Sequence, residues 1–457
     1  MVGLKAKLFG SSGVRGVVNT DLTPALALKI GLATATHSKA GKILVARDTR
    51  VSGLMLENAV VAGLLAGGVD VDCVGVVPTP VLAWLTQRTR ATTGIMLTAS
   101  HNPPKYNGIK IFHGNSVAYG ETDQNRIETI VQNESFKLAD WLKIGKALST
   151  NQTHLYEDMI LEKIQLNKQW HVTVDPGCGA THHLAPMILK NLGCKVTAIN
   201  AQPDGFFPAR NSEPSKESLQ SLAEIVRELG ADLGVAYDGD GDRVAFIDEK
   251  GNFVDFDRCL AAYAAHAVNE KQGGVIVTNV EASMCVEKMV EKKRGEVIRV
   301  KVGDIYVSHE MRDHDSVFGG EPCGAWIHPR FHYCPDGVLS SALLLKALEE
   351  KEITTSEFVS QVPQYPTLRE NIPCGNEVKH KLVSKIGDNL KTLFPRYKDF
   401  ATIDGVRLTL ENGWILIRAS GTEPLMRLTV EGESLRAAKQ IMRESIRLVR
   451  RIIKEKT

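Results

Sequence analysis

The sequence lacks the features that mark membrane, secreted and nucleic-acid-binding proteins. No stretch approaches the roughly 18 apolar residues of a membrane span, and the first residues hold no apolar segment with a cleavage site. The 55 Lys and Arg residues nearly balance the 53 Asp and Glu residues, and a net charge of +2 favours neither nucleic acid nor an anionic membrane as partner. We therefore expect a cytoplasmic protein whose partners are small molecules, and a homodimer is left open.

Disulfide and nucleotide-binding motifs are also missing. The eight cysteines include no CxxC pair, which fits reduced thiols better than a disulfide framework. No GxxxxGK[ST] segment occurs, so a bound phosphate would not be held by a Walker loop.

The sequence does contain short apolar runs that alternate with helical patterns, as in α/β proteins. These runs form three sets of three expected strands: 43–46, 71–77 and 94–99, then 172–175, 195–199 and 233–237, then 274–279, 297–302 and 316–320. After about residue 366, Asp-Gly and Asn-Gly turns between alternating runs indicate an antiparallel sheet. We predict three similar α/β domains and a smaller C-terminal α+β domain, with boundaries at 1–150, 151–253, 254–366 and 367–457.

The third strand of each set runs into an unusual polar loop. The three loops read SHNPP, DGDGDR and EPCGAW in chain order. Ligands of α/β sheets collect outside the carboxyl ends of the strands. We therefore expect the three loops to face one cleft.

The second loop has the composition of a magnesium site. Asp238, Asp240 and Asp242 alternate with glycines that allow the backbone to fold the carboxylates around one point. An EF-hand is excluded, because its sixth position would be Arg243 instead of Gly. An aspartyl-phosphate enzyme stays open as an alternative, with Asp238 as the nucleophile.

The first loop presents a serine. Ser100 stands beside His101, and Pro103 and Pro104 restrict the turn that follows. A phosphorylated serine facing a magnesium site would be a stored phosphoryl donor. Lys110 lies one short strand away and could serve as acid or base if neighbouring cations or burial lower its pKa.

Two further segments indicate a sugar phosphate. Guanidinium groups, hydroxyls and a glycine turn that could cradle a phosphate occur together at Arg418, Ser420, Gly421, Thr422 and Arg427. A similar glycine-serine turn near the start carries Arg15. Glu321 in the third loop could accept hydrogen bonds from vicinal sugar hydroxyls. The nearby Cys323, His328, His332 and Cys334 suggest zinc by composition, but their spacing is irregular for a structural site.

With these four motifs in this order, the sequence resembles the α-D-phosphohexomutase family along almost its whole length. The resemblance implies mixed sheets around a central cleft and a phosphoryl group carried by Ser100. It implies that Ser100 and the three aspartates bind Mg2+. The expected catalytic residues are Ser100, His101, Lys110 and Arg15, and the expected substrate-binding residues are Arg243, Glu321, Cys323, Arg418, Ser420, Gly421, Thr422 and Arg427.

The implied reaction moves a phosphoryl group through a bisphosphorylated hexose, which also serves as activator. The third loop is most similar to that of archaeal phosphoglucosamine mutases, so we favour interconversion of glucosamine 6-phosphate and glucosamine 1-phosphate. A phosphomannomutase/phosphoglucomutase is the alternative. Many members read Glu-x-Ser-Gly-His in this loop, whereas this chain has Cys323 and Ala325, and His328 is a candidate to replace the missing histidine.

Overall fold

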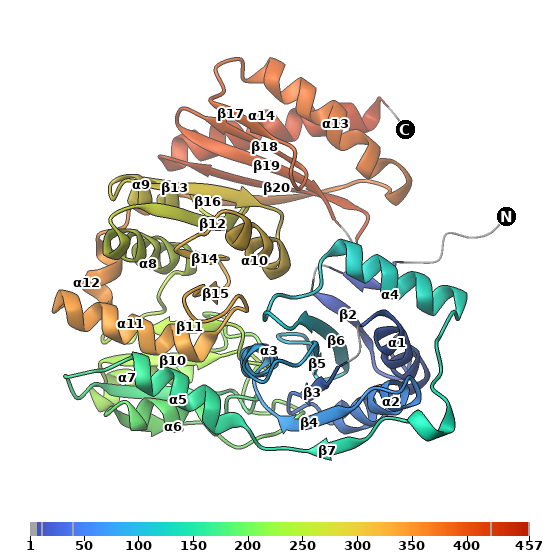
Figure 1. The fold of residues 1–457 in the computed structure, drawn as a ribbon. Helices are drawn as coiled ribbons and strands as arrows, with labels where there is room; N and C mark the ends of the chain where they lie inside the picture. Colours follow the sequence, from blue (N-terminus) through green and yellow to red (C-terminus); the bar gives the residue numbers. More distant parts are fainter. Residues whose placement is uncertain (1–6, 11, 39–40, 421–422, 456–457) are drawn as a thin grey trace.

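The structure is a computed structural model of the 457-residue chain, and it describes residues 7–10, 12–38, 41–420 and 423–455. Four sheets follow one another along the chain (Figure 1). In this view the first (blue) lies at the right, the second (green) and third (yellow) lie at the left, and the fourth (red) lies at the top. No helix in these ranges is both long and apolar enough to cross a bilayer.

The first sheet has seven strands in the order β1-β2-β6-β5-β3-β4-β7. Its strands are β1 (Phe9–Gly10), β2 (Gly13–Val17), β3 (Ile43–Arg47), β4 (Val71–Val76), β5 (Thr93–Leu97), β6 (Tyr106–His113) and β7 (Ala147–Ser149). Its helices are α1 (Pro24–His37), α2 (Gly53–Ala66), α3 (Thr79–Arg88) and α4 (Glu121–Asn133), followed by a 3-10 turn at Trp141–Lys143.

The second and third sheets have four strands each. The second region comprises α5 (Thr153–Lys163), β8 (His171–Asp175), α6 (Leu184–Asn191), β9 (Lys195–Ala198), α7 (Gln220–Leu229), β10 (Leu233–Tyr237) and β11 (Val244–Ile247). The third comprises α8 (Phe256–Lys271), β12 (Gly274–Asn279), α9 (Cys285–Glu291), β13 (Gly295–Val300), α10 (Asp304–Asp313), β14 (Phe318–Gly320), β15 (Trp326–Ile327), α11 (Gly337–Lys351) and α12 (Thr355–Ser360).

The three sheets repeat one topology. The sheets contain the strand orders β6-β5-β3-β4, β11-β10-β8-β9 and β15-β14-β12-β13, in which the first strand is antiparallel to the second and the others are parallel. The nine expected strands correspond to β3, β4, β5, β8, β9, β10, β12, β13 and β14. The prediction of three similar α/β units with mixed sheets is therefore confirmed, and each polar loop occupies the same hairpin of its unit.

The fourth sheet is antiparallel throughout, as the turns in the sequence indicated. It has the order β16-β20-β19-β18-β17 and is packed against two helices. Its elements are β16 (Thr367–Pro373), α13 (Asn376–Leu393), β17 (Asp399–Ala401), β18 (Val406–Leu410), β19 (Gly413–Ala419), β20 (Leu425–Gly432) and α14 (Leu435–Lys454). Apolar residues of α14 such as Ile441 and Val449 are buried on the sheet, which leaves its basic residues toward solvent.

The hydrophobic cores explain how the units are joined. One cluster runs from Leu44 in the first sheet through Val235 in the second to Phe318 in the third, so these three units share a continuous core. The fourth unit has its own core, and a small cluster around Trp414 and Val280 connects it to the third. The first three units therefore hold their hairpin loops in fixed positions relative to one another.

Backbone atoms of the second and third hairpin loops are in direct contact. The Val244 N–H donates to the Gly324 carbonyl at 3.0 Å, and a Cβ at Gly324 would lie 2.0 Å from the Val244 carbonyl oxygen. Gly324 also has a φ of +84°, in the left-handed region. Only glycine fits this close approach.

We predict that Gly324→Ala lowers the free energy of unfolding by more than Gly193→Ala. Gly193 has a φ of +92° but nothing within 4 Å of a Cβ, so its substitution adds only the backbone strain, about 1 to 3 kcal/mol. Gly324→Ala causes a similar backbone strain and, in addition, a steric clash with the Val244 carbonyl oxygen. Urea unfolding of both variants measures the difference, and equal losses would show that the contact between the loops does not contribute.

Candidate active site

A cavity of about 260 Å³ lies where the three hairpin loops meet. Its lining comes from all three repeated units: Ser12, Arg15, Ser100, His101, Asp242, Arg243, Asn279, Glu281, Val302, Gly303, Asp304, Glu321, Pro322, Cys323 and Ala325. The expectation that the loops face one cleft is confirmed for these residues.

The aspartates of the second loop are deeply buried. Asp238 and Asp240 are fully inaccessible and Asp242 is 5% exposed. Burial, together with the neighbouring carboxylates, raises the pKa of Asp238 and of Asp242. Burial also acts to raise the pKa of Asp240, but the ammonium of Lys110 outweighs it and the pKa falls. Lys110 Nζ lies 2.9 Å from Asp240 Oδ2 and 2.6 Å from Asp242 Oδ2.

This group fits a divalent cation. One carboxylate oxygen from each aspartate lies within 4.8 Å of the other two. Asp240 Oδ1 is buried and has no hydrogen-bond partner among the described residues, so it is available as a ligand atom. Three hard oxygen donors with an unpartnered lone pair match the ligands that such cations take.

Ser100 stands against these carboxylates in a strained backbone conformation. It is 1% exposed and has a φ of +51°, which a non-glycine residue adopts only when its surroundings impose it. Its Oγ donates to Asp238 Oδ2 at 2.6 Å and lies 3.3 Å from His101 Nδ1. Burial, followed by the charges of Arg243 and Arg15, lowers the pKa of His101 to about 3.

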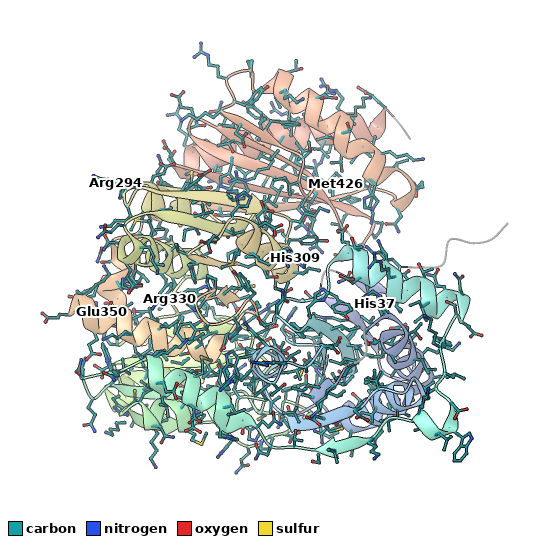
Figure 2. The ribbon with its side chains drawn as sticks, viewed as in Figure 1. His37, Arg294, His309, Arg330, Glu350 and Met426 are labelled. Atoms are coloured by element: carbon teal, nitrogen blue, oxygen red, sulfur yellow. The ribbon has the colours of Figure 1, made fainter. Side chains whose placement is uncertain are left out.

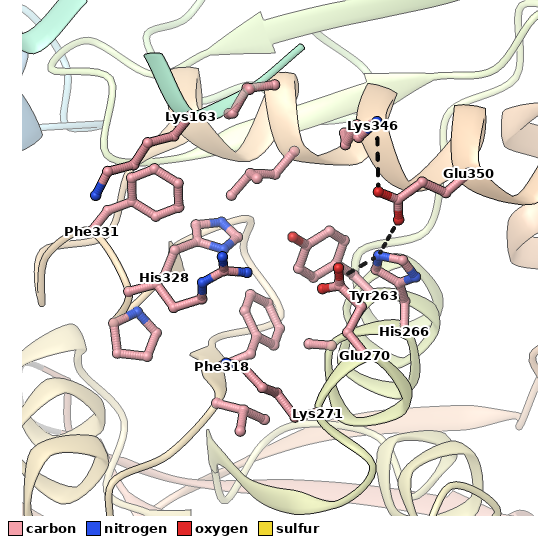
Figure 3. A pocket seen from close by; sticks show the side chains of 16 residues that line it. Lys163, Tyr263, His266, Glu270, Lys271, Phe318, His328, Phe331, Lys346 and Glu350 are labelled. Atoms are coloured by element: carbon pink, nitrogen blue, oxygen red, sulfur yellow. Dashed lines mark ion pairs between the residues drawn. The ribbon is translucent and has the colours of Figure 1, made fainter. Parts of the chain in front are cut away.

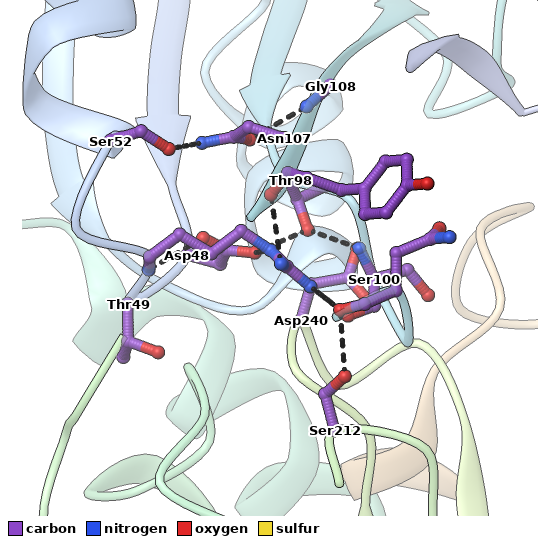
Figure 4. A network of polar contacts seen from close by, with 12 residues as sticks. Asp48, Thr49, Ser52, Thr98, Ser100, Asn107, Gly108, Ser212 and Asp240 are labelled. Carbon is purple, nitrogen blue, oxygen red and sulfur yellow. Dashed lines mark hydrogen bonds and ion pairs between the residues drawn. The ribbon is translucent and has the colours of Figure 1, made fainter. Parts of the chain in front are cut away.

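A buried arginine that sequence reasoning missed holds the serine loop in this conformation, within a polar network whose labelled members in Figure 4 include Asp48, Ser100 and Ser212. The Arg50 guanidinium donates to the carbonyl oxygens of Ser100 at 2.8 Å and Asn102 at 2.6 Å, and to two further carbonyls of the same loop. Asp48 pairs with Arg50 at 3.0 Å. From the second unit, the Ser212 hydroxyl donates to the carbonyl of His101 at 2.7 Å.

The two other expected catalytic residues lie in the same place. Arg15 donates to Asn102 Oδ1 at 2.8 Å, and its Nε is buried without a partner among the described residues. Burial acts to lower the pKa of Lys110, but Asp240 and Asp242 outweigh it and raise the pKa. The condition stated for Lys110 as a base, a lowered pKa, is therefore not met in this structure.

The third loop presents a carboxylate with one oxygen occupied. Glu321 Oε1 accepts from Asn279 Nδ2 at 2.7 Å and from the Gly303 N–H at 2.8 Å. Burial, followed by the charge of Asp304, raises the pKa of Glu321 to about 7. Cys323 lines the same cavity, and burial raises the pKa of its thiol to about 12.

His328 does not replace the histidine that this loop lacks. It lies behind the loop in a different cavity, with Nε2 2.9 Å from the Ser340 hydroxyl. The zinc alternative also fails: His332 pairs with Asp336, and the four Cys and His residues of this segment form no metal-binding cluster among the described residues. Asn279, Glu281 and Asp304 line the cavity instead.

The expected phosphate cradle lies in the fourth unit. Arg418 pairs with Glu281 of the third unit and with Asp404 at 2.7 Å. Ser420 is buried, and its Oγ accepts from the Glu423 N–H at 3.2 Å. Arg427 is half exposed and pairs with Glu423 at 2.9 Å. The other two expected residues, Gly421 and Thr422, lie outside the described residues.

Arg243 is the last of the expected substrate-binding residues. It lines the cavity, and its backbone N–H donates to Asp238 Oδ1 at 3.1 Å. Burial acts to lower its pKa, but Cys323 and the carboxylates around it outweigh this and raise it. The site thus joins a buried hydroxyl, a cation-binding carboxylate group, three cationic side chains and a sugar-compatible carboxylate.

Family models match nearly all of the chain in the same order. Phosphoglucomutase/phosphomannomutase alpha/beta/alpha domains I, II and III match residues 6–138, 153–251 and 255–365, and the C-terminal domain of that family matches residues 371–448. The chain belongs to the phosphoglucomutase/phosphomannomutase family. The resemblance drawn from the motifs is therefore confirmed, while the exact domain boundaries stay a prediction.

Relatives of this family are similar over the full length. A protein of Pyrococcus furiosus described as "Probable phosphoglucosamine mutase" is 42% identical over 449 residues, 98% of this chain and 99% of the relative. One with the same description from Methanothermobacter thermautotrophicus is 42% identical over 439 residues, 96% of each chain. The crystal structure of a phosphoglucomutase/phosphomannomutase family protein from Burkholderia thailandensis has a TM-score of 0.88 and 28% identity, covering 98% and 97% of the two chains.

We predict that Arg50→Lys lowers turnover of a hexose phosphate about tenfold or more, because a lysine cannot bond several carbonyls at once and small displacements of reacting groups are costly. The matched control is Arg47→Lys, which alters an ion pair to Glu57 in the same unit. Both variants are expected to lose stability. Steady-state kinetics together with thermal unfolding separate the effects, and equal turnover in the two variants would contradict a role of Arg50 in placing Ser100.

Proposed function

We propose that this protein interconverts glucosamine 6-phosphate and glucosamine 1-phosphate, with a phosphoserine at residue 100 as phosphoryl donor. The observation that carries the proposal is the Ser100 hydroxyl, which lies 2.6 Å from Asp238 within a cation-binding carboxylate group and beside the cavity. A serine ester at this point would be both buried and oriented, two conditions that phosphoryl transfer requires.

The transfer step uses the side chains of the candidate active site. A free hydroxyl of the sugar attacks the phosphorus, so that a P–O bond to the sugar forms while the bond to Ser100 Oγ breaks. The proton of the sugar hydroxyl ends on Ser100 Oγ, which becomes a hydroxyl again. The bisphosphorylated sugar then turns over, and its other phosphate returns to Ser100. Arg15 lines the same cavity and its Nε has no partner among the described residues, so it would bond the transferring oxygens, and His101 Nδ1 lies 3.3 Å from Oγ.

Asp238, Asp240, Asp242 and the phosphorylated Ser100 would hold Mg2+, which would neutralise charge on the transferring oxygens. Lys110 balances the charge of Asp240 and Asp242, because its Nζ pairs with Oδ2 of each. Asp238 is a poor candidate for nucleophile, since Ser100 Oγ and the Arg243 N–H already bond to its two oxygens. This arrangement favours serine over aspartate as the phosphoryl carrier.

The sugar has to bind in two orientations, and few groups recognise it. Glu321 keeps Oε2 for sugar hydroxyls, because the hydrogen bonds from Asn279 and Gly303 use Oε1. Arg243 and Cys323 line the same wall. Arg418, Ser420, Gly421, Thr422 and Arg427 would hold the phosphate that is not being transferred.

The choice of glucosamine rests on the relatives described as phosphoglucosamine mutases and on the acidity of the cavity. Asp304 and Glu321 form an acidic part of the wall of this cavity. A substrate with an ammonium group suits such a wall better than a neutral hexose does.

A coupled assay should therefore give a kcat/KM for glucosamine 6-phosphate at least about tenfold above those for mannose and glucose phosphates. Ser100→Ala serves as the inactive control in each assay. A preference for mannose or glucose phosphate would replace the proposal with the phosphomannomutase/phosphoglucomutase alternative.

The phosphoryl carrier can be identified chemically. Protein treated with a bisphosphorylated hexose should bear one phosphate that resists hydroxylamine and maps to the peptide around Ser100, because a serine ester is stable where an acyl phosphate is cleaved. Phosphate on the Asp238 peptide that survives Ser100→Ala would establish the aspartyl-phosphate reaction instead.

We also predict that Glu281→Gln lowers the KM for the sugar phosphate by up to about fivefold, since partly exposed ion pairs contribute about 0.2 to 1 kcal/mol. The pair that Arg418 makes with Glu281 must break or rearrange when a phosphate takes the guanidinium. Glu291→Gln, on the neighbouring helix α9, is the control. A KM that rises in Glu281→Gln alone would show that this carboxylate binds substrate and does not compete with it.

A further inference from the structure

A second cavity, of about 480 Å³, lies behind the third hairpin loop (Figure 3). Its walls come from the end of α5, one side of α8, the strand β14, the segment after β15 and one side of α11. Phe318 and His328 flank the hairpin that carries Glu321, so this cavity and the candidate active site lie on opposite sides of the same loop. The reaction proposed above uses none of its residues.

Two nearly buried polar side chains in this cavity make no hydrogen bond within the part of the chain that the structure describes. His266 on α8 is 8% exposed, and Tyr263, one turn earlier, is 5% exposed. Among the described residues, neither the imidazole nor the phenol hydroxyl has a hydrogen-bond partner, and Figure 3 shows the hydroxyl pointing into the cavity. Buried polar groups are almost always bonded to protein, water or a ligand.

The imidazole of His266 faces two carboxylates. Its Nε2 lies 3.8 Å from Glu270 Oε2, one helical turn further along α8, and 3.8 Å from Glu350 Oε2 on α11. These separations are too long for hydrogen bonds. The glutamate side chains are 42% and 38% exposed, so an ion could reach the group from solvent.

We propose that His266, Glu270 and Glu350 form a binding site for a divalent transition metal of the zinc class. The three ligand atoms lie within 4.8 Å of one another. Ligand atoms about 2.0 to 2.2 Å from a tetrahedral zinc ion are about 3.4 Å apart, so both distances of 3.8 Å from His266 Nε2 must shorten by about 0.4 Å. The two glutamate oxygens, which lie within 4.8 Å of each other, must come to the same separation. Both side chains are partly exposed, as Figure 2 shows for Glu350 at the edge of the molecule, so they have room to move. The imidazole nitrogen selects against magnesium and calcium, which take oxygen ligands.

The surroundings support this assignment. Glu350 uses its other oxygen, Oε1, for Lys346 at 3.7 Å, so Oε2 stays available while the side chain is held in place. The Tyr263 hydroxyl lies in the same cavity and is free to bond a water on the ion.

The site would connect α8 to α11, the two helices that enclose the third hairpin from behind. Its expected effect is stabilisation of the native chain, because an ion that binds the folded form alone shifts the unfolding equilibrium.

The test uses the full-length protein freed of metal with a chelator and titrated with Zn2+ in competition with a chromophoric chelator. The unaltered chain should take up one more equivalent of Zn2+ than Glu270→Gln and one more than Glu350→Gln, whatever other sites bind. Zn2+ should also raise the Tm of the unaltered chain by more than it raises the Tm of either variant. Both substitutions are at partly exposed positions, and thermal unfolding in chelator shows that the variants fold.

His314→Gln is the matched control, because His314 also pairs with a glutamate one turn away, Glu310 at 3.0 Å, but on the exposed surface of α10. It should bind as much Zn2+ as the unaltered chain. The assignment is overturned if either glutamate variant takes up as much Zn2+ as the unaltered chain, or if His314→Gln lowers the uptake equally.

Discussion

The carboxylates of the second hairpin loop impose the constraint on which the rest of the site depends. At an effective dielectric constant of about 20, two like charges about 4 Å apart repel by about 4 kcal/mol, and three buried aspartates raise this cost further. Lys110, the Ser100 hydroxyl and the Arg243 N–H all contact these carboxylates and reduce it. The first unit therefore contributes two groups that contact the acidic loop, the ammonium of Lys110 and the hydroxyl of Ser100.

The repeated topology makes this convergence possible. Each α/β unit delivers one hairpin loop from the carboxyl end of its third parallel strand, and the continuous core keeps the three hairpins adjacent. Backbone contacts then set the spacing: Val244 bonds Gly324, and a Cβ at Gly239 would lie 2.6 Å from the Ser100 carbonyl oxygen. Small residues in the loops are thus required by loop-to-loop contact as well as by their own turns.

Local patterns were sufficient to predict nine parallel strands and the antiparallel C-terminal sheet, because apolar periodicity and turn residues act over short distances. Arg50 was missed, although it follows β3 at the same end of the sheet as Ser100, because its role depends on carbonyl groups 50 or more residues away. His328 was a candidate to replace the missing histidine but lines a different cavity, since sequence proximity to Glu321 does not specify on which face of a hairpin a side chain lies. The pair of Arg418 with Glu281 joins two units and has no local signal.

The three hairpins have separate roles, and this separation affects how the substrate preference of such an enzyme can change during evolution. In the proposed reaction, the phosphoryl carrier and the cation site occupy the first two hairpins, while the groups nearest the sugar occupy the third. Residues such as Cys323 and Ala325 line the cavity, and among the described residues neither makes a hydrogen bond to Asp238. Substitutions in the third hairpin can therefore change which hexose is used while the residues that transfer the phosphoryl group stay the same. A shared fold alone does not identify the hexose that a member of the family uses.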